Sequence, residues 1–579
     1  MKYQVNHVQL QGLLAELRPF HPELPKSSRS IVHTPTSTRI VELNNGTYVH
    51  IGLVKGLEAR LQNGTRRDVS KLHVDINIDG LTYSESSSVD VWPILARSVD
   101  LFDCKPFVVG IFCGKAKPDP LETYLKQYKE EEESLHRVGL NVNQLQYSVA
   151  IRTYILDSPA RAYVKQVKGH TAIEGCERCD QKGEKSYREM TTFQTVKGNP
   201  RTDESFSNQT DPGHHLGVSP LADLPDHGLV SMFALDPMHL LEHGVLKRFL
   251  LFLLGKYTTR VKLDANAILS VSAILESLHP YIVRELARTK PRALALVGKC
   301  KATELRLFLL YIGIVALDCD GVAENVYKLF LILFGASRIV SSPVLVLDEK
   351  FVNFAEKLFE TFVQHSGDAQ VCGKHFVSYN IHSLLHLVDD VRRYRALTNF
   401  SAYPFENFLG VLKRLVRSGV NIPQQLARRL AEREGVYDDD VPVSESEQFS
   451  LGPFNEKLGG HSYLACDSFV LIPQSKKDCF FKLANAVGKL KCISQVGSEV
   501  VVTADICNEL GDFFTYPTSS KKIGVFVLKQ WTSFNIKLGV SEIAGKVMVL
   551  SSTKGDIGVK LLHTTNNWVR VPLVISFYI

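Results

Sequence analysis

Four side chains with metal-binding chemistry occur as two closely spaced pairs. Cys176 and Cys179 are separated by two residues, a spacing that lets both sulfurs bind one tetrahedral metal ion, usually zinc. A single pair of this kind is half a site, and it could equally be a redox pair. The best candidate for the other half is His382 with His386, because such a pair on a helix places both imidazoles on one face.

Other assignments of these positions stay open. His382 and His386 could be ordinary residues of an amphipathic helix. The missing ligands could also come from other histidines, and these candidates are His170, His214, His215, His239 and His243. Spacing alone does not choose between these sets.

A second set of candidates consists of acidic residues at the ends of predicted strands. Residues 71–79 alternate with a period of two, so that one face is apolar and the other, which ends in Asp79, is largely acidic. Gly80 lets the backbone leave the strand sharply. Asp157 ends another predicted strand, over residues 147–156. Adjacent strand ends can bring two carboxylates close enough to share Mg²⁺, which prefers oxygen ligands.

A third carboxylate normally completes such a cage. Glu406 is the favoured choice, because it opens a predicted helix over residues 404–418 directly after Pro404. Asp75 shares the strand face of Asp79 and is its natural competitor. Each acidic residue taken alone could equally be a solvated surface residue or a helix cap.

The elements around these residues follow a recognisable order. Strands are predicted at 71–79, 89–94, 106–113 and 147–156, with a helix at 119–137 before the last of them. This order, with one aspartate in the first strand and another at the end of the fourth, is typical of an α/β ribonuclease-H-like core. We expect Asp119 to be the N-cap of the helix, Pro120 its first residue, and its glutamates a solvated face.

The rest of the chain changes character twice. Between about 225 and 400, apolar residues at three- and four-residue spacing predict an all-helical block. Its expected helices are Met238–Gly255, Ala265–Leu286, Thr303–Leu317, Ala323–Ser337, Val344–Phe362 and Tyr379–Tyr394. An acidic linker follows, and beyond it short β-rich runs predict a small barrel or sandwich.

Composition limits the class of protein. The 579 residues are 45% hydrophobic and 22% charged, with a net charge of +6, which suits a globular chain of several domains and allows a phosphate-binding surface. Eleven cysteines and no apolar leader predict a reducing compartment. No apolar stretch approaches the roughly 18 residues of a bilayer-spanning helix. We therefore expect a soluble intracellular protein.

Over roughly residues 20–435 the chain resembles the CACTA (En/Spm-like) DNA transposases, including their animal transposase-domain form. The resemblance rests on ordered blocks of sequence. They are LPKSSRSIVHTPT (24–36), INIDGLTYSES with VWPIL downstream (76–95), ILDSPARAYVKQVKGHTAIEGCERC (155–179), HHLGVSPL (214–221), LDPMHLLEHGVLKRFL (235–250) and HSLLHLVDDVRRYRALTNFSAYPFENFLGVLKRLVRSG (382–419).

This resemblance implies a DDE-type ribonuclease-H-like domain interrupted by a helical insertion. Matched residue by residue, its catalytic metal ligands fall on Asp79, Asp157 and Glu406, which would hold two Mg²⁺ or Mn²⁺ ions. It further implies cleavage and strand transfer of transposon-end DNA into target DNA, in the nucleus, by a homo-oligomer that contacts no membrane. Basic residues after the glutamate could meet DNA phosphates, and these are Lys413, Arg414 and Arg417.

The RAG-type recombinases look similar at this level and carry a CxxC after the second aspartate and a histidine pair before the glutamate. Here Cys176 lies 19 residues after Asp157, and Glu406 lies 20 residues after His386. The resemblance thus implies a structural Zn²⁺ held by Cys176, Cys179, His382 and His386. Its filled tetrahedron would leave no open catalytic position.

Two features complicate this assignment. Asp236 of the prominent DPMH motif could be mistaken for the second catalytic position, but it starts a predicted helix, where capping explains it. No recognisable DNA-binding module precedes residue 20. The alternative function is therefore a domesticated, catalytically inactive scaffold that binds DNA or proteins. A zinc-dependent hydrolase is disfavoured, because no ligand position stays open.

The expected domain organisation follows from these points. It consists of an irregular lead-in (1–68), the first part of the catalytic core with the CxxC pair (69–224), the helical insertion (225–400), the closing helix with the glutamate (401–436), an acidic linker (437–460) and a C-terminal β-rich domain (461–579).

Overall fold

The structure is a computed structural model that describes residues 7–562, except for 63, 66–68, 83–88, 186–189, 258, 287–289, 435–448 and 467. The chain divides into two compact units. The first unit comprises residues 1–169, 202–234 and 402–444, and the second comprises 170–201, 235–401 and 445–579. Both units are built from segments that are distant in sequence.

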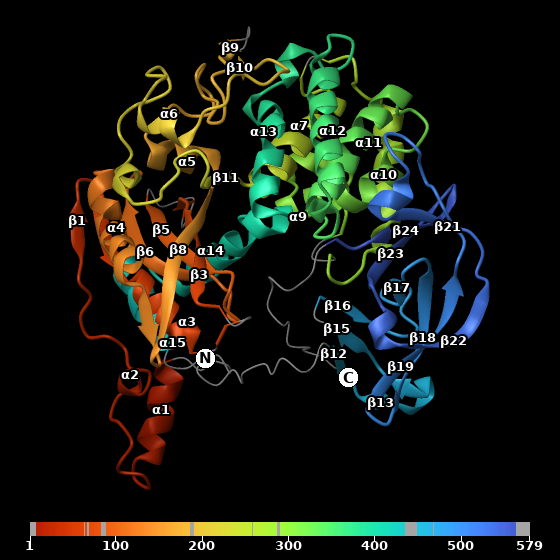
Figure 1. The fold of residues 1–579 in the computed structure, drawn as a ribbon. Coiled ribbons are helices and arrows are strands. Elements are labelled where there is room, and N and C mark those ends of the chain that lie inside the picture. The colour runs from red at the N-terminus through yellow and green to blue at the C-terminus, as the bar shows by residue number, and fades with distance from the viewer. Residues whose placement is uncertain are drawn as a thin grey trace. The chain divides into compact units, whose positions relative to one another are not determined.

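The first unit is organised around a mixed sheet, drawn in red to yellow in Figure 1. Its strand order is β1-β2-β6-β5-β3-β8-β11, with β4 paired to β5 and β7 to β8. Neighbouring strands from β1 to β3 run antiparallel, whereas β3 and β8 run parallel. The strands are β1 (Val41–Leu43), β2 (Gly46–His50), β3 (Lys71–Ile78), β4 (Leu81–Thr82), β5 (Asp90–Ser98), β6 (Phe107–Gly114), β7 (Leu140–Val142), β8 (Leu145–Leu156) and β11 (Phe233–Leu235).

Helices cover both faces of this sheet. On one face, α4 packs its Tyr124, Leu125 and Tyr128 against the apolar side of β3 in a common core. On the other face lies α14, because the Phe405 ring is 5.3 Å from the guanidinium of Arg97, whose strand position pairs with Asp75. The helices of this unit are α1 (His7–Leu17), α2 (Ser28–Ile31), α3 (Leu53–Leu61), α4 (Leu121–Val138), α5 (Ser158–Lys165), α6 (Asp203–Ser207), α14 (Tyr403–Leu415) and α15 (Ile422–Glu434).

Residues 7–62 are more ordered than the irregular lead-in expected from sequence. β2 pairs with β6 over five residues and so extends the central sheet, and β1 pairs with β2. The short polar segments hid these strands, because a three-residue strand carries almost no periodic signal. This part of the chain also contains the nine-residue helix α3.

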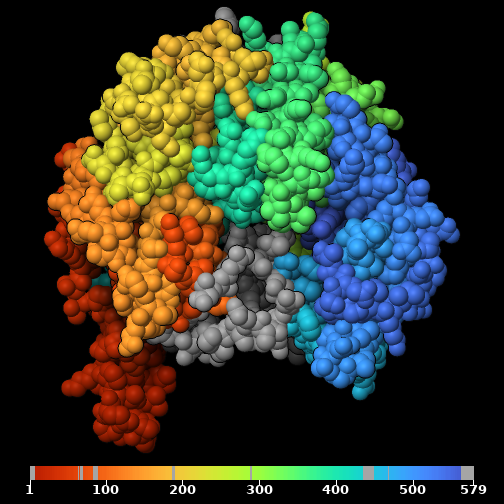
Figure 2. Space-filling view, in the orientation of Figure 1, coloured from red at the N-terminus to blue at the C-terminus, as the bar shows by residue number. Residues whose placement is uncertain are grey.

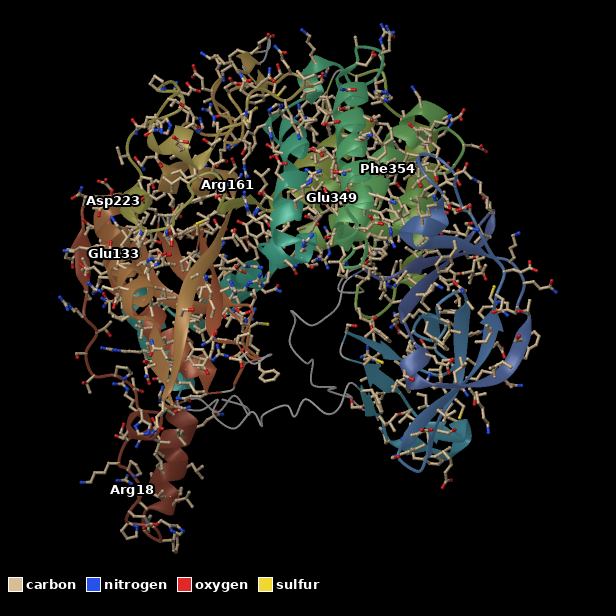
Figure 3. The ribbon with its side chains drawn as sticks, viewed as in Figure 1. Arg18, Glu133, Arg161, Asp223, Glu349 and Phe354 are labelled. Carbon is tan, nitrogen blue, oxygen red and sulfur yellow. The ribbon has the colours of Figure 1, made fainter. Side chains whose placement is uncertain are left out.

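The beginning and the glutamate-rich side of α4 also differ from expectation. Pro120, not Asp119, is the N-cap residue, and no side chain caps the helix. Glu133 is exposed, as Figure 3 shows, but Glu132 is buried and bonds to His227, and Glu131 accepts hydrogen bonds from His50 and the Leu53 amide. The helix therefore uses part of its acidic run to hold neighbouring segments.

The second unit contains the helical block. Tyr379–Tyr394 is confirmed as α13, whereas the helix expected to reach Leu286 ends at Ser277. Two π-helical stretches, Met238–Leu246 and Phe308–Ile312, interrupt other expected helices. The α-helices are α7 (Lys247–Leu253), α8 (Ala265–Ser277), α9 (Ala302–Leu307), α10 (Gly313–Ala316), α11 (Glu324–Ser341), α12 (Glu349–Gly367) and α13 (Tyr379–Tyr394). A two-stranded sheet of β9 (Glu184–Lys185) and β10 (Thr191–Thr192) lies in the CxxC segment.

The C-terminal part of this unit is β-rich, as expected. Its main sheet has the order β20-β21-β24-β23-β17-β18-β19-β22. Residues 437–448 of the predicted acidic linker (437–460) lie outside the described residues. Residues 449–460 are not a linker, because they contain β12 and β13, so the β-rich part begins earlier than the expected residue 461. The strands are β12 (Phe449–Leu451), β13 (Phe454–Asn455), β14 (Gly460–His461), β15 (Leu464–Cys466), β16 (Phe469–Leu471), β17 (Phe480–Lys482), β18 (Val487–Val496), β19 (Glu499–Cys507), β20 (Leu510–Gly511), β21 (Val525–Leu528), β22 (Ser533–Gly539), β23 (Gly545–Ser552) and β24 (Gly555–Lys560).

Two buried cations attach the β-rich part to the helical block, whose contact is visible between the blue and green atoms of Figure 2. Lys546 of β23 is fully buried and forms ion pairs with Glu285 at 2.7 Å and Asp478 at 2.6 Å. Arg338 of α11 is also fully buried and donates to the carbonyl oxygens of Ile523 and Lys560. Burial lowers the pKa of Arg338 to about 10. The β-rich domain is thus an integral part of the second unit.

No helix in the described part of the chain is both long and apolar enough to cross a membrane.

The buried cluster around Lys546 predicts a large effect of a single substitution. Lys546→Met should lower the free energy of unfolding by about 3–5 kcal/mol, because it leaves two buried carboxylates without a counter-charge. Lys554→Met is the matched control, since Lys554 pairs with Asp318 at the surface, and it should cost at most about 1 kcal/mol. Urea unfolding of both full-length variants measures the difference. Equal losses would contradict the role of the buried cluster.

Candidate functional site

Asp79 and Asp157 follow the ends of two neighbouring parallel strands in the first unit. The last paired positions of β3 and β8 are Ile76 and Tyr154. Asp79 lies three residues after Ile76, and Asp157 lies three residues after Tyr154. Neighbouring strands are about 4.8 Å apart. The pairing of β3 with β8 therefore brings both aspartates to one edge of the sheet.

Both aspartates belong to the same face of the sheet by strand alternation. In β3, Ile78 lies in the core under α4, so Asp79 falls on the opposite side. In β8, Leu156 lies in that same core, so Asp157 also falls on the opposite side. This is the face that α14 covers.

Glu406 lies in the first turn of α14, next to the Phe405 ring that packs on Arg97. Its side chain is half-buried, as is that of Asp79. The three predicted ligands thus share one unit and one face of the sheet. Among the described residues, the three carboxylates are not part of a group of side chains close enough to hold a metal ion.

Both aspartates accept hydrogen bonds from backbone amides. Asp157 is the N-cap of α5 and accepts a hydrogen bond from the amide of Ala160 at 2.7 Å. Asp79 accepts one from the amide of Gly80 at 2.7 Å. Each of these bonds uses one carboxylate oxygen.

Asp75, the competitor of Asp79, has a structural role. It is fully buried, and its carboxylate forms ion pairs with Arg97 at 3.0 Å and Arg152 at 2.7 Å. A carboxylate paired with two arginines is already neutralised and has few lone pairs left for a metal ion. This contact distinguishes Asp75 from Asp79, which sequence alone could not do.

Lys117 is a basic residue near Asp157 that sequence reasoning missed. Its ammonium lies 5.1 Å from the centroid of the Tyr163 ring and 5.6 Å from that of Trp92, and it donates to the carbonyl of Pro159. Burial lowers the pKa of Lys117, and the charge of Asp157 opposes this shift. It lies in the loop between β6 and α4, where no pattern marked it.

The predicted zinc ligands come together in the second unit. Cys176 and Cys179 lie in the segment with β9 and β10, and His382 and His386 lie one turn apart on α13. All four are buried, and their ligand atoms lie within 4.8 Å of one another. The sulfurs are 3.5 Å apart, and the sulfur-to-Nε2 distances are 3.3 Å for Cys179–His382 and 3.8 Å for Cys176–His386.

These separations fit one tetrahedral zinc ion. Bonds of about 2.3 Å to sulfur and about 2.0 Å to nitrogen at tetrahedral angles place two sulfurs about 3.8 Å apart, and a sulfur and a nitrogen about 3.5 Å apart. The ligand types and these three distances match this geometry. Cys176 and Cys179 are free thiols.

The surroundings hold these ligands in place. Nδ1 of His382 donates to the carbonyl of Gln194 at 3.2 Å, which leaves Nε2 for the metal, and the Phe193 ring stacks on the imidazole. Between the two cysteines, Arg178 pairs with Asp390 of α13 at 2.8 Å in the protein interior. The metal ligands thus lie in a rigid, preformed pocket.

Electrostatics in this pocket favour one thiolate. The hydrogen bond from the Cys176 thiol, with help from His382 and His386, holds the pKa of Cys179 far below its usual value. Burial raises the pKa of Cys176 and lowers that of His386. A neutral imidazole and a thiolate are the forms that bind zinc.

The other candidate histidines belong to no such group among the described residues. His239 bonds to Asp236 at 2.6 Å. Asp236 is buried and also accepts from the amides of Met238 and His239, which agrees with a capping role for the DPMH motif.

Glu242 is a second titratable group that the sequence did not reveal. It is buried one turn beyond His239, and Oε2 has no hydrogen-bond partner among the described residues. Burial raises the pKa of Glu242 to about 8, although Arg306 opposes the shift. Burial also lowers the pKa of His243 to about 4. The one sequence signal for this burial is that apolar residues flank Glu242 on both sides in LLEHGVL.

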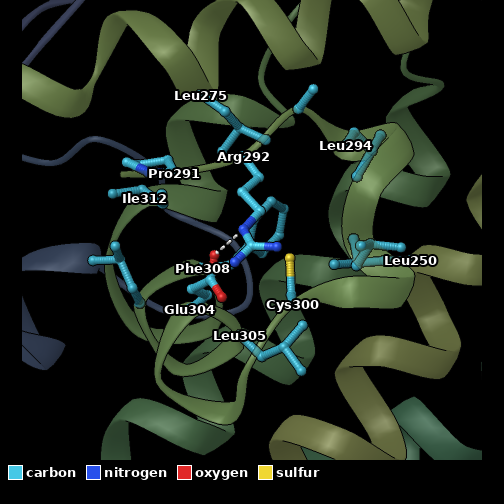
Figure 4. Close-up of a pocket in the computed structure, with 13 residues that line it drawn as sticks. Leu250, Leu275, Pro291, Arg292, Leu294, Cys300, Glu304, Leu305, Phe308 and Ile312 are labelled. Atoms are coloured by element: carbon cyan, nitrogen blue, oxygen red, sulfur yellow. Dashed lines mark ion pairs between the residues drawn. The ribbon is translucent and has the colours of Figure 1, made fainter. Parts of the chain in front are cut away.

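A cavity of about 30 Å³ in the second unit is lined mainly by apolar residues and contains the ion pair of Arg292 with Glu304 at 2.8 Å (Figure 4). It has room for one or two water molecules. None of the predicted ligands lines it. The predicted DNA contacts Lys413, Arg414 and Arg417 are exposed at and beyond the end of α14.

Comparison with known proteins gives one match. Residues 448–572 match a domain of unknown function, DUF8592, which corresponds to the β-rich part of the second unit. No curated protein matches the chain. The match assigns no activity to the β-rich part.

The buried carboxyl of Glu242 predicts a pH-dependent effect on stability. The fold accommodates Glu242 in its protonated form. The resulting stability is fully present below the unfolded pKa near 4.5, and it is lost as pH rises towards the folded pKa of about 8. Glu242→Gln should therefore gain thermal stability relative to the natural chain between pH 5 and pH 8.5. Glu276→Gln, at an exposed position of α8, should show no such trend. If the melting temperatures of both variants changed with pH in the same way, the burial of a neutral Glu242 would be contradicted.

Proposed function

We propose that this protein is a DDE-type DNA transposase that cleaves and joins DNA by divalent-metal-dependent phosphoryl transfer. The observation that carries the proposal is the shared register of Asp79 and Asp157 at the ends of adjacent parallel strands. Two carboxylates at one sheet edge are the arrangement that a pair of hard cations requires.

The sheet topology supports a ribonuclease-H-like core. Strands β3, β5, β6, β8 and β11 occur in this chain order and lie in the sheet as third, second, first, fourth and fifth. The first three are antiparallel, and β8 joins β3 in parallel after the α4 crossover. In such a core the second unit's helices interrupt the chain between β11 and α14.

The residues around the sheet edge have complementary tasks in this proposal. Asp79 and Asp157 would hold the ions, and Glu406 would complete the cage from α14. When bound, two Mg²⁺ or Mn²⁺ ions about 3.5–4 Å apart would activate the attacking water or 3′-hydroxyl and stabilise the leaving oxygen. Lys117 would place a positive charge near Asp157, where the scissile phosphate of the DNA would lie.

The cysteine and histidine group supports a structural zinc ion within the same proposal. Its four ligands fill a tetrahedron, so that no position is left for a substrate. The ion would join the CxxC segment to α13 and stabilise the second unit. Transposon ends and target DNA as substrates, a homo-oligomeric assembly and action in the nucleus follow from the transposase assignment.

An assay of strand transfer tests the proposal. Full-length protein is incubated with Mn²⁺ or Mg²⁺, a labelled oligonucleotide with a free 3′-hydroxyl and a supercoiled plasmid. Asp157→Asn should reduce joining at least about 100-fold, equivalent to about 2.7 kcal/mol, because it removes a ligand of both ions. Asp320→Asn, at an exposed loop of the second unit, should retain full activity.

Two outcomes would contradict this assignment. Equal activity of Asp157→Asn and the natural chain would remove Asp157 from the site. Absence of metal-dependent cleavage in every variant, with DNA binding intact, would instead favour the inactive, DNA-binding scaffold.

Metal analysis tests the zinc site independently. The purified natural chain should contain about one zinc per chain, and His386→Ala should lose it together with several degrees of thermal stability. Cys372→Ser is the matched control, because Cys372 is buried in the same unit but lies outside the cluster. Full zinc content in His386→Ala would exclude this histidine as a ligand.

A further inference from the structure

The positive charge of the chain is concentrated in the β-rich domain. Residues 448–572 contain fourteen Lys and Arg residues against nine Asp and Glu residues, a net charge of +5, whereas the whole chain carries +6. The remaining residues are thus almost neutral. A small domain with such an excess has the electrostatic footprint of a nucleic-acid contact.

The basic residues meet on one face of the sheet formed by β18, β19 and β22. In this register Lys489 pairs with Asp505, and Thr503 pairs with Lys537, so these side chains share a face by alternation. Lys491 lies at the bulge in β18 and reaches Asn535 of β22 at 3.3 Å. We call these three lysines, Lys489, Lys491 and Lys537, the basic face.

Two of these cations lack a counter-ion. Lys491 pairs with Asp505 at 2.8 Å. No carboxylate of the described residues lies within 4.0 Å of the ammonium of Lys489 or Lys537, and both side chains are exposed. Asp505 is therefore used by Lys491, and Glu499, at the start of β19, is the other acidic residue on this face by alternation. Lys489 and Lys537 keep their charge available.

Two aromatic rings pack beside Lys489, and the nearer ring, that of Phe480, is buried. Phe480 of β17 is the strand partner of Lys489, whose ammonium is 6.0 Å from the ring centroid. The ring of Trp531 lies 6.3 Å from that of Phe480 and is half-buried. Because Phe480 is buried, it supports the position of Lys489, and the phosphate contact would be made by the lysines.

We propose that the basic face binds the phosphate backbone of DNA, independently of the metal ions and without sequence preference. Charge complementarity and the unpaired lysines favour this occupant. The inference goes beyond the proposed catalysis and concerns a domain without assigned function. The buried ion pairs of Lys546 fix the domain to the helical block, so that the contact would hold DNA at a defined place on the second unit.

Salt-dependent DNA binding tests this site. Fluorescence anisotropy of a labelled 30-base-pair duplex is measured with the full-length protein in EDTA across a range of NaCl concentrations. The double substitution Lys489→Gln and Lys537→Gln should lower the slope of log affinity against log salt by about two, since each lost phosphate contact contributes about 0.9. Both residues are exposed, so the fold should be unaffected.

The matched control removes the same charge elsewhere in the domain. Lys521 and Lys522 are exposed in the short 3₁₀ helix at Ser520–Ile523, and their double substitution by Gln should leave the slope unchanged. Equal slopes for the two double variants would overturn the proposal, because the contact would then be a general charge effect. Displacement of the duplex by polyglutamate at equal charge concentration would also overturn it in favour of an acidic protein partner.

The Asp157→Asn variant distinguishes DNA binding by the basic face from the proposed catalysis. In Asp157→Asn, binding in EDTA and its loss in the Lys489 and Lys537 variant should persist even though joining is lost. Failure of strand transfer would leave the basic face supported, and failure of the salt-slope difference would leave the catalytic proposal intact.

Discussion

The parallel pairing of β3 with β8 is the constraint on which the first unit depends. Parallel neighbours need a crossover connection, which α4 supplies across the apolar face. Because their register is fixed by the buried residues of both strands, Asp79 and Asp157 reach the same edge together. A slip of one strand by one residue would turn that strand over and place the two aspartates on opposite faces.

Contacts on the sheet face opposite α4 explain where α14 packs. Asp75 forms buried ion pairs with Arg97 and Arg152. Burial of any of these charges without its ion-pair partner would cost folding free energy. The ring of Phe405 covers Arg97. This contact directs the first turn of α14, and with it Glu406, to the face that carries both aspartates.

Much of this arrangement follows from local sequence patterns. The alternation of β3 predicted its apolar face, and the spacing of His382 and His386 predicted a shared helix face that α13 confirms. The meeting of these histidines with Cys176 and Cys179 came from a resemblance, because no local rule relates residues two hundred positions apart. Burial of the acidic face, the strands within residues 41–50 and the place of Lys117 depend on tertiary contacts, which periodicity does not report.

In the proposed mechanism Asp79 and Asp157, with Glu406, hold two divalent ions. The most direct measurement is anomalous diffraction from crystals of the full-length protein soaked in Mn²⁺. We expect two anomalous peaks about 3.5–4 Å apart at the ends of β3 and β8, both within bonding distance of carboxylate oxygens. Strong Mn²⁺ peaks elsewhere, with none between these two aspartates, would contradict this mechanism.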